Sequence, residues 1–314
     1  MPLSTTIDSL SKLNHRHVIT SVSTNSELIE ALQSNTLATS ERQLLTAETQ
    51  TAGRGQHTRS WQSPAGNVYL SLYHPIDIAI SGLLSLIVGL ELAKMPIIQT
   101  LNERLEGQGK PSIGVKWAND LGFYTLPEQD KTLNLAKNNI IAFSKLAGIL
   151  IEPVLWGGKL TGVVIGVGLN VAATPKLTMQ TLEGMSYQAL SLRDVNESLQ
   201  DDKLESLPSL TLIYHQISQA LLNAIHCFKN IAAEKSNLQT NLDERATTQF
   251  NKQFEQHDAL KNLRIRITQN LNNKEHVIEG LACGIDTNGC LQLKQDNGNI
   301  SALFTGRIDV INEA

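Results

Sequence analysis

Apolar residues along the first 260 positions follow two periods, which predicts strands interleaved with helices. Alternation beginning at His17 and short apolar, β-branched runs are typical of strands, and the runs lie at 44–47, 67–71, 113–116, 145–152 and 161–170. Apolar residues three and four apart are typical of helices with a buried face, and they occur at 28–32, 83–101 and 212–231. This order predicts one large domain of mixed α and β structure.

The pattern changes after about residue 260, where short strands with period-two alternation follow one another. Candidate strands lie at 263–267, 277–281, 291–293 and 300–304. The dipeptides Asn288-Gly289 and Asn297-Gly298 favour tight hairpins, because both residues accept positive φ. We therefore expect a small SH3-like β-barrel over 259–314.

Two polar stretches interrupt the first domain, which we place at 1–258. Residues 121–144 have no clean periodicity and are predicted to form an inserted loop. Residues 196–210 are polar and acidic, and are predicted to be a linker whose charges are solvated.

Composition excludes several classes of protein. With 314 residues and a formal net charge of -4, the chain lacks the basic character of most nucleic-acid-binding domains. Its three cysteines are too few and too irregularly spaced for a disulfide framework or a zinc site. The N-terminus does not read as a signal peptide, and the uncharged apolar run at 78–90 is too short to cross a bilayer. We expect a cytoplasmic protein that binds neither DNA nor membranes.

The stretch from Gln50 to Ser71 contains the first candidate site. Arg54 lies between Gly53 and Gly55, and glycines let a backbone turn sharply and approach a ligand closely. Such a loop can present amide N–H groups and a bidentate cation to a phosphate or carboxylate. A surface loop with one solvated arginine explains the same three residues.

A second candidate lies at Ser23, Thr24 and Asn25, where the strand that begins at His17 changes to helical spacing. These residues can cap the helix, with Glu27 completing a capping box with Thr24. A helix N-terminus also offers N–H groups and hydroxyls to a polar ligand. Capping and binding are compatible, and the sequence favours neither.

Two further segments combine polar groups with strand ends. Lys116 to Asp120 places a lysine, an indole, an amide and a carboxylate within five positions. Taken alone, the segment is better explained by an exposed lysine, a core tryptophan and an Asn-Asp turn than by a binding site. Gly166 and Gly168 alternate on one strand, which leaves either room for a ligand against bare backbone or a bulge packed beneath a helix.

Six motifs in this order resemble those of the biotin protein ligases. They are STN at 23–25, QTAGRG at 50–55, RSW at 59–61, KWAND at 116–120, KLAGILIE at 145–152 and GVGLN at 166–170. The resemblance implies an α+β fold, a mixed sheet with helices like that of the class II aminoacyl-tRNA synthetases, followed by the small barrel. Because fewer than twenty-five residues precede STN, we expect the single-function type without an N-terminal winged helix-turn-helix.

The resemblance implies an enzyme that forms biotinyl-5′-AMP from biotin and ATP, with Mg²⁺, and transfers biotin to a lysine of the biotin carboxyl carrier protein of acetyl-CoA carboxylase. The implied catalytic residues are Arg54, Lys116 and Lys145. The implied biotin-binding residues are Ser23, Thr24, Asn25, Gln50, Arg54, Gly55, Gln56, Lys145 and Gly168. The implied ATP-binding residues are Arg54, Arg59, Trp61, Lys116, Asn119, Asp120 and Asn170. The metal ligands stay open, as does a possible homodimer.

The sequence departs from the family pattern after the Gly-Arg-Gly loop. Gln56 and Thr58 stand where many members have arginine and glycine, and Ala118 replaces a common proline. A glutamine lacks the charge with which arginine helps to hold the adenylate, so we expect weaker retention of the intermediate. This motivates an alternative function, a biotin-binding regulator or sensor with reduced ligase activity. Lipoate ligases are the nearest enzyme alternative, but the motif set fits biotin better.

Overall fold

The computed structural model describes residues 13–56, 59–126, 139–176, 186–199, 206–235, 245–271 and 274–312. Its strands are β1 (Asn14–Ser21), β2 (Gln43–Gln50), β3 (Val68–Pro75), β4 (Gly114–Lys116), β5 (Asp120–Tyr124), β6 (Ile140–Ile141), β7 (Phe143–Trp156), β8 (Lys159–Leu169), β9 (Tyr187–Ala189), β10 (Arg264–Leu271), β11 (Lys274–Ile285), β12 (Leu291–Lys294), β13 (Ile300–Leu303) and β14 (Arg307–Ile311). Its helices are α2 (Thr24–Gln33), α3 (Gly82–Ala93), α4 (Pro96–Gly107), α6 (Leu192–Ser198), α7 (Leu210–Lys235) and α8 (Ala246–His257).

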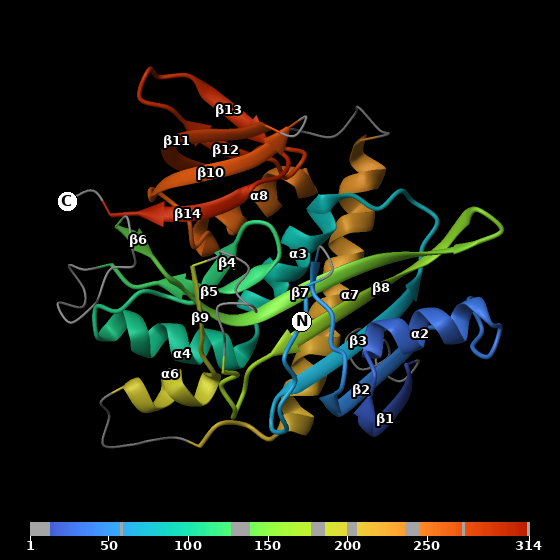
Figure 1. The fold of residues 1–314 in the computed structure, drawn as a ribbon. Coiled ribbons are helices and arrows are strands. Elements are labelled where there is room, and N and C mark those ends of the chain that lie inside the picture. Colours follow the sequence, from blue (N-terminus) through green and yellow to red (C-terminus); the bar gives the residue numbers. More distant parts are fainter. Residues whose placement is uncertain are drawn as a thin grey trace.

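The larger sheet confirms the mixed α/β prediction. Its strands run in the order β1-β2-β3-β8-β7-β5-β4, with β9 beside β7. Two pairs, β1 with β2 and β7 with β9, are parallel, and the others are antiparallel. Figure 1 shows the long β7–β8 pair crossing the centre of the molecule.

The alternation of side chains on β8 gives the two faces of the sheet different roles. Val163, Ile165 and Val167 belong to the main core, together with apolar residues of α3 and α7. Val164 faces the other way and packs with Leu28 and Leu32 of α2. Since successive strand residues point to opposite faces, Gly166 and Gly168 lie on the α2 face. The helical layer fills one face and leaves the other for a site.

The apolar stretch from 83 to 101 forms two helices, so the prediction of one helix was wrong. Pro96 is the first residue of α4 and cannot donate the backbone hydrogen bond that a continuing helix needs. No single helix among the described residues is long and apolar enough to span a membrane, although α3 and α4, bent by 68°, pass that test as a pair.

The strands after residue 260 form a second sheet with its own small core. The order is β13-β12-β11-β10-β14-β6, and every pairing is antiparallel. Buried residues such as Ile265, Leu293 and Val310 fill the core. The predicted strands are confirmed, but among the described residues the sheet is open, with no pairing between β13 and β6 to close a barrel. The 258/259 boundary stays a prediction.

The two polar segments were placed too broadly. Residues 120–124 form β5, 140–141 form β6 and 143–144 begin β7, so strands enter the predicted 121–144 loop from both sides. Apolar side chains explain this, because Leu121 and Ile141 are buried. Positions 127–138 lie outside the described residues. Likewise α6 extends into the predicted linker as far as Ser198, and 200–205 lie outside the described residues.

The second sheet joins the first through a close backbone contact at Gly114. Val115 forms a parallel bridge with Asp258, and Ala259 N donates to Val115 O at 3.0 Å. A Cβ at Gly114 would overlap the carbonyl oxygen of His257 and lie 3.2 Å from Ala259 N. Only glycine fits here without a backbone shift.

We expect Gly114→Ala to lower the free energy of unfolding by about 1–3 kcal/mol, because the new methyl group meets backbone. Gly107→Ala is the matched control, since Gly107 ends α4 with nothing within 4 Å of its Cβ position. Thermal unfolding of both variants measures the difference. Equal transition temperatures would contradict the contact.

Candidate functional site

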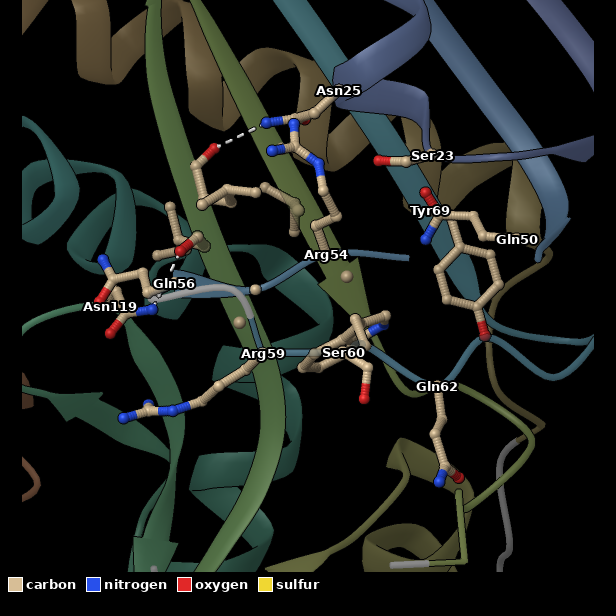
Figure 2. Close-up of a pocket in the computed structure, with 18 of the residues that line it drawn as sticks. Ser23, Asn25, Gln50, Arg54, Gln56, Arg59, Ser60, Gln62, Tyr69 and Asn119 are labelled. Carbon is tan, nitrogen blue, oxygen red and sulfur yellow. Dashed lines mark hydrogen bonds between the residues drawn. The ribbon is translucent and has the colours of Figure 1, made fainter. Parts of the chain in front are cut away.

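A cavity opens on the α2 face of the larger sheet, where segments distant in sequence meet (Figure 2). Side chains from the start of α2, the loop after β2, the β4–β5 turn, β7, β8 and β9 line it. The lining includes these expected site residues: Ser23, Thr24, Asn25, Gln50, Arg54, Gly55, Gln56, Arg59, Trp61, Asn119, Asp120, Lys145, Gly168 and Asn170. Lys116 is the one expected residue that does not line the cavity.

The residues at the start of α2 are tied to the loop and to the sheet. Gln50 Oε1 accepts hydrogen bonds from Thr24 N at 2.9 Å and from Thr24 Oγ1 at 3.2 Å. The predicted capping box is wrong: Ser23 is the N-cap without a side-chain cap bond, and Glu27 accepts from Ser21 Oγ and Val22 N. A side chain 26 positions away thus does the capping.

The Gly-Arg-Gly loop is a short hairpin with an arginine that already has a partner. Arg54 bridges to Ser60. The Arg54 guanidinium donates to Glu152 in bidentate fashion, at 3.0 and 2.7 Å, and Asn25 Nδ2 donates to the same carboxylate at 2.9 Å. Figure 2 shows Arg54 and Asn25 pointing toward each other. The tip residues His57 and Thr58 lie outside the described residues.

Protein side chains fill the space above the alternating glycines of β8. A Cβ on Gly168 would lie 2.5 Å from Trp61 Cε2, and one on Gly166 would overlap the Asn25 amide. The indole also covers Gly148 of β7, and its Nε1 has no hydrogen-bond partner among the described residues. The bare backbone predicted here accommodates Trp61, so a ligand lying against Gly168 has to displace the indole.

Four polar side chains form one chain of contacts at the floor of the cavity. Lys145 Nζ lies 2.7 Å from Asp120 Oδ1. Tyr187 Oη donates to Asp120 Oδ2 at 2.7 Å and accepts from Lys116 Nζ at 3.0 Å. Lys116 is the last residue of β4 and pairs with Asp120 across the β4–β5 hairpin. The end of the strand at Lys116 therefore brings these groups together.

Burial and charge act in opposite directions on the pKa values of Asp120 and Lys116, and in the same direction on that of Tyr187. Burial would raise the pKa of Asp120, but Lys145 and Lys116 together bring that pKa below its ordinary value. Burial lowers the pKa of Lys116 to about 7, although Asp120 acts in the opposite direction. Burial and then Asp120 raise the pKa of Tyr187 well above its ordinary value. Near neutral pH the site therefore contains an ionised carboxylate, a neutral tyrosine and a lysine close to titration.

The two asparagines expected to bind ATP, Asn119 and Asn170, hold backbone in place at the edge of the cavity. Asn119 Nδ2 donates to Ile149 O at 3.0 Å. Asn170 Nδ2 donates to Leu190 O at 3.1 Å, and Asn170 is only 2% exposed. Both amides shape the rim of the site through these bonds.

Among the residues of the site that sequence reasoning missed, Glu152 and Tyr187 contact the expected charged groups directly. Glu152 is the last residue of the KLAGILIE motif, and a carboxylate within an otherwise apolar strand was the signal that could have marked it. Tyr187 lies on the three-residue strand β9, within a segment that has no clear periodicity. Only the parallel pairing of β9 with β7 brings it beside the lysine site.

The sequence matches a known family over the part of the chain that builds this cavity. Residues 18–170 match the Biotin/lipoate A/B protein ligase family. The lining residues of the cavity lie within this matched range, except Pro175, Tyr187 and Ala189.

Curated relatives align with parts of the chain. The bifunctional ligase/repressor BirA of Salmonella typhimurium is 37% identical over 130 residues, which are 40% of this chain and 32% of that protein. The biotin--[acetyl-CoA-carboxylase] ligase of Mycobacterium tuberculosis is 32% identical over 185 residues, 57% of this chain and 54% of that protein. The chain thus spans between a third and about half of the length of these relatives.

Solved structures extend the likeness to the whole fold. The biotin protein ligase from Aquifex aeolicus in complex with biotin and ATP has a TM-score of 0.58 and 20% sequence identity, and the match covers 94% of this chain and 97% of that one. At this identity the likeness concerns the fold, and it includes both sheets.

The Arg54–Glu152 pair gives the first prediction for the site. We expect Glu152→Gln to increase the affinity for inorganic pyrophosphate about three- to tenfold, because it frees the guanidinium for a phosphate while leaving Asn25 an oxygen acceptor. Isothermal titration calorimetry measures the change.

Glu48→Gln is the control for this measurement, since Glu48 is a half-exposed carboxylate on β2 whose ion-pair partner is His17. We expect no change in affinity from it. Unchanged or weaker pyrophosphate binding by Glu152→Gln would mean that the ion pair holds the loop in its binding shape.

Proposed function

We propose that the protein is an ATP-dependent biotin protein ligase of the acetyl-CoA carboxylase carrier type. The observation that carries this proposal is the cavity itself, to which all six ligase-like motifs supply lining residues around the Lys145–Asp120 ion pair. A cavity with an apolar part and a few fixed polar groups suits a small ligand such as biotin. Lys116, in the same motif as Asn119 and Asp120, does not line the cavity but donates to Tyr187, which does.

The first step of the proposed reaction joins biotin to AMP. A biotin carboxylate oxygen attacks the α-phosphorus of ATP, the bond to the β-phosphate oxygen breaks, and pyrophosphate leaves. The reacting groups are all negatively charged, so cations that face the cavity do most of the work. Lys145 is suited to hold the biotin carboxylate and the adenylate oxygens, and Arg54 can reach a phosphate once Glu152 releases it.

The second step transfers biotin to the carrier. The uncharged amine of a carrier lysine attacks the acyl carbon of the adenylate, the carbon–oxygen bond to the phosphate breaks, and AMP leaves with that electron pair. The amine loses a proton as the amide forms. Asp120, ionised at neutral pH, lies at the floor of the cavity.

We propose that Mg²⁺ enters with the ATP phosphates. The described residues contain no group of three or more histidine, cysteine, aspartate or glutamate side chains that could hold a metal ion. Oxygen atoms of the nucleotide are the ligands that Mg²⁺ prefers in nucleotide sites. The ion would neutralise phosphate charge during adenylation.

The choice of biotin over lipoate, and of the carrier, belongs to the proposal. The matched family includes lipoate ligases, whereas the relatives aligned above are named for biotin or for a bifunctional ligase. We propose a cytoplasmic location, because the carrier protein of acetyl-CoA carboxylase would be encountered there. The SH3-like character of the second sheet and a homodimer are proposed on the resemblance alone.

The direct test is biotin transfer to a carrier domain of acetyl-CoA carboxylase with Mg²⁺–ATP. We expect the intact chain to label one carrier lysine and Lys145→Ala to lose a factor of about 100 or more, because a charge that stabilises the reacting oxygens is gone. Lys94→Ala is the control, because Lys94 is a surface lysine paired with Glu91. Carrier labelling that persists in Lys145→Ala, or that is absent from the intact chain, contradicts the proposal.

Gln56 gives a second prediction. We expect Gln56→Arg to slow dissociation of preformed biotinyl-5′-AMP about tenfold, since an arginine at the cavity wall adds charge-assisted hydrogen bonds to the phosphate. Stopped-flow displacement by excess biotin measures the rate. Gln62→Arg adds the same charge at another lining position and serves as the control. If both variants slow dissociation equally, the effect is general electrostatics and the special role of position 56 is refuted.

A further inference from the structure

Tyr187 lies outside the six ligase-like motifs, at a position between Lys116 and Lys145. It lies on β9, whose parallel pairing with β7 sets Tyr187 opposite Phe143 and Ala189 opposite Lys145. Its side chain lines the cavity. The residue therefore faces the ligand space and the interior of the protein at the same time.

The Tyr187 hydroxyl uses both of its hydrogen-bonding functions on charged partners. It accepts from Lys116 Nζ at 3.0 Å and donates to Asp120 Oδ2 at 2.7 Å. The other oxygen of the carboxylate lies 2.7 Å from Lys145 Nζ. The path from Lys116 to Lys145 thus runs through one hydroxyl and one carboxylate.

Lys116 has no direct route to a ligand in the cavity. It is 4% exposed and does not line the cavity. Its ammonium lies 4.1 Å from the centre of the Tyr187 ring and 5.0 Å from that of Phe143. An ammonium against aromatic faces is stabilised, but two rings do not replace water. Its hydrogen bond to Tyr187 Oη is therefore important for keeping it charged.

Other charged groups act on Lys116 from the surrounding elements. Asp309 on β14 favours the charged form of Lys116, while Lys145 on β7 and Arg59 on the loop oppose it. Tyr124 on β5 completes the aromatic surroundings through its contact with Phe143, at 4.9 Å between ring centroids. Tyr187 is in direct contact with both Lys116 and Asp120.

We propose that Tyr187 is a positioning residue of this site, and that its hydroxyl couples Lys116 to Asp120 so that a buried lysine acts on the cavity through the carboxylate. The hydroxyl fixes the rotamer of Asp120, which in turn fixes Lys145. The contribution of Tyr187 to catalysis rests on the proposed ligase activity. The coupling of Lys116 to Asp120 through its hydroxyl is independent of that activity.

The test compares Tyr187→Phe with the intact chain in two measurements. The first follows the Cε chemical shift of Lys116 against pH by NMR of lysine-labelled protein, with Lys116→Arg used for assignment. Lys116 has a pKa of about 7 in the intact chain. We expect Tyr187→Phe to lower its titration midpoint by about one pH unit or more, because the ammonium loses its acceptor while the ring stays.

The second measurement is the pH profile of biotin-dependent pyrophosphate release. Loss of the donor to Asp120 moves the acidic limb to higher pH, and loss of the acceptor for Lys116 moves the alkaline limb to lower pH. We therefore expect a profile narrowed from both sides, with the KM values for biotin and ATP within about twofold of the intact chain. A residue needed only for packing would lower the rate without moving either limb.

Tyr124→Phe is the matched control. Tyr124 is a buried tyrosine that contacts the same phenylalanine, and the structure gives its hydroxyl no bond to Lys116 or Asp120. We expect it to leave the Lys116 midpoint and the profile unchanged. Equal Lys116 midpoints in the two variants would overturn the inference. If the intact chain releases no pyrophosphate, the proposed function fails, and the NMR titration still decides whether Tyr187 couples the charges.

Discussion

The buried carboxylate of Asp120 is the constraint on which the site depends. A carboxylate that is 4% exposed is tolerated only with charged or hydrogen-bonding partners close by. Lys145 and Tyr187 provide them. To bring these partners together, β4 has to end at Lys116, β5 has to lie beside β7, and β9 has to run parallel to β7. Three strand pairings of the larger sheet are thus needed to give the Asp120 carboxylate its partners.

The two faces of the same sheet explain why the site lies where it does. Large apolar residues of β8 pack against α3 and α7, while its glycines face α2. Trp61 and Asn25 fill the space above those glycines, and Glu152 holds Arg54. In this arrangement Arg54 and Lys145 are paired with carboxylates, and the indole packs against Gly148 and Gly168. Ligand binding on the α2 face would exchange these contacts for contacts with biotin and phosphate.

Local patterns predicted most of the strands because period-two alternation is a short-range signal, and the short motifs singled out residues that line one cavity. The capping of α2 was beyond such patterns, since Gln50 caps the helix from another strand. The break at Pro96 was visible in the sequence, but the apolar period on both sides obscured it. Tyr187 became evident only through a strand pairing across more than forty positions. Side chains brought together by tertiary structure leave little trace in a single sequence.

We propose that this cavity activates biotin with ATP. The most direct measurement is mass spectrometry of a quenched reaction that contains the intact chain, biotin and Mg²⁺–ATP without any carrier. We predict biotinyl-5′-AMP, with one pyrophosphate released for each adenylate formed. Biotin and ATP that remain unreacted, or an adenylate formed from lipoate but none from biotin, would contradict the account.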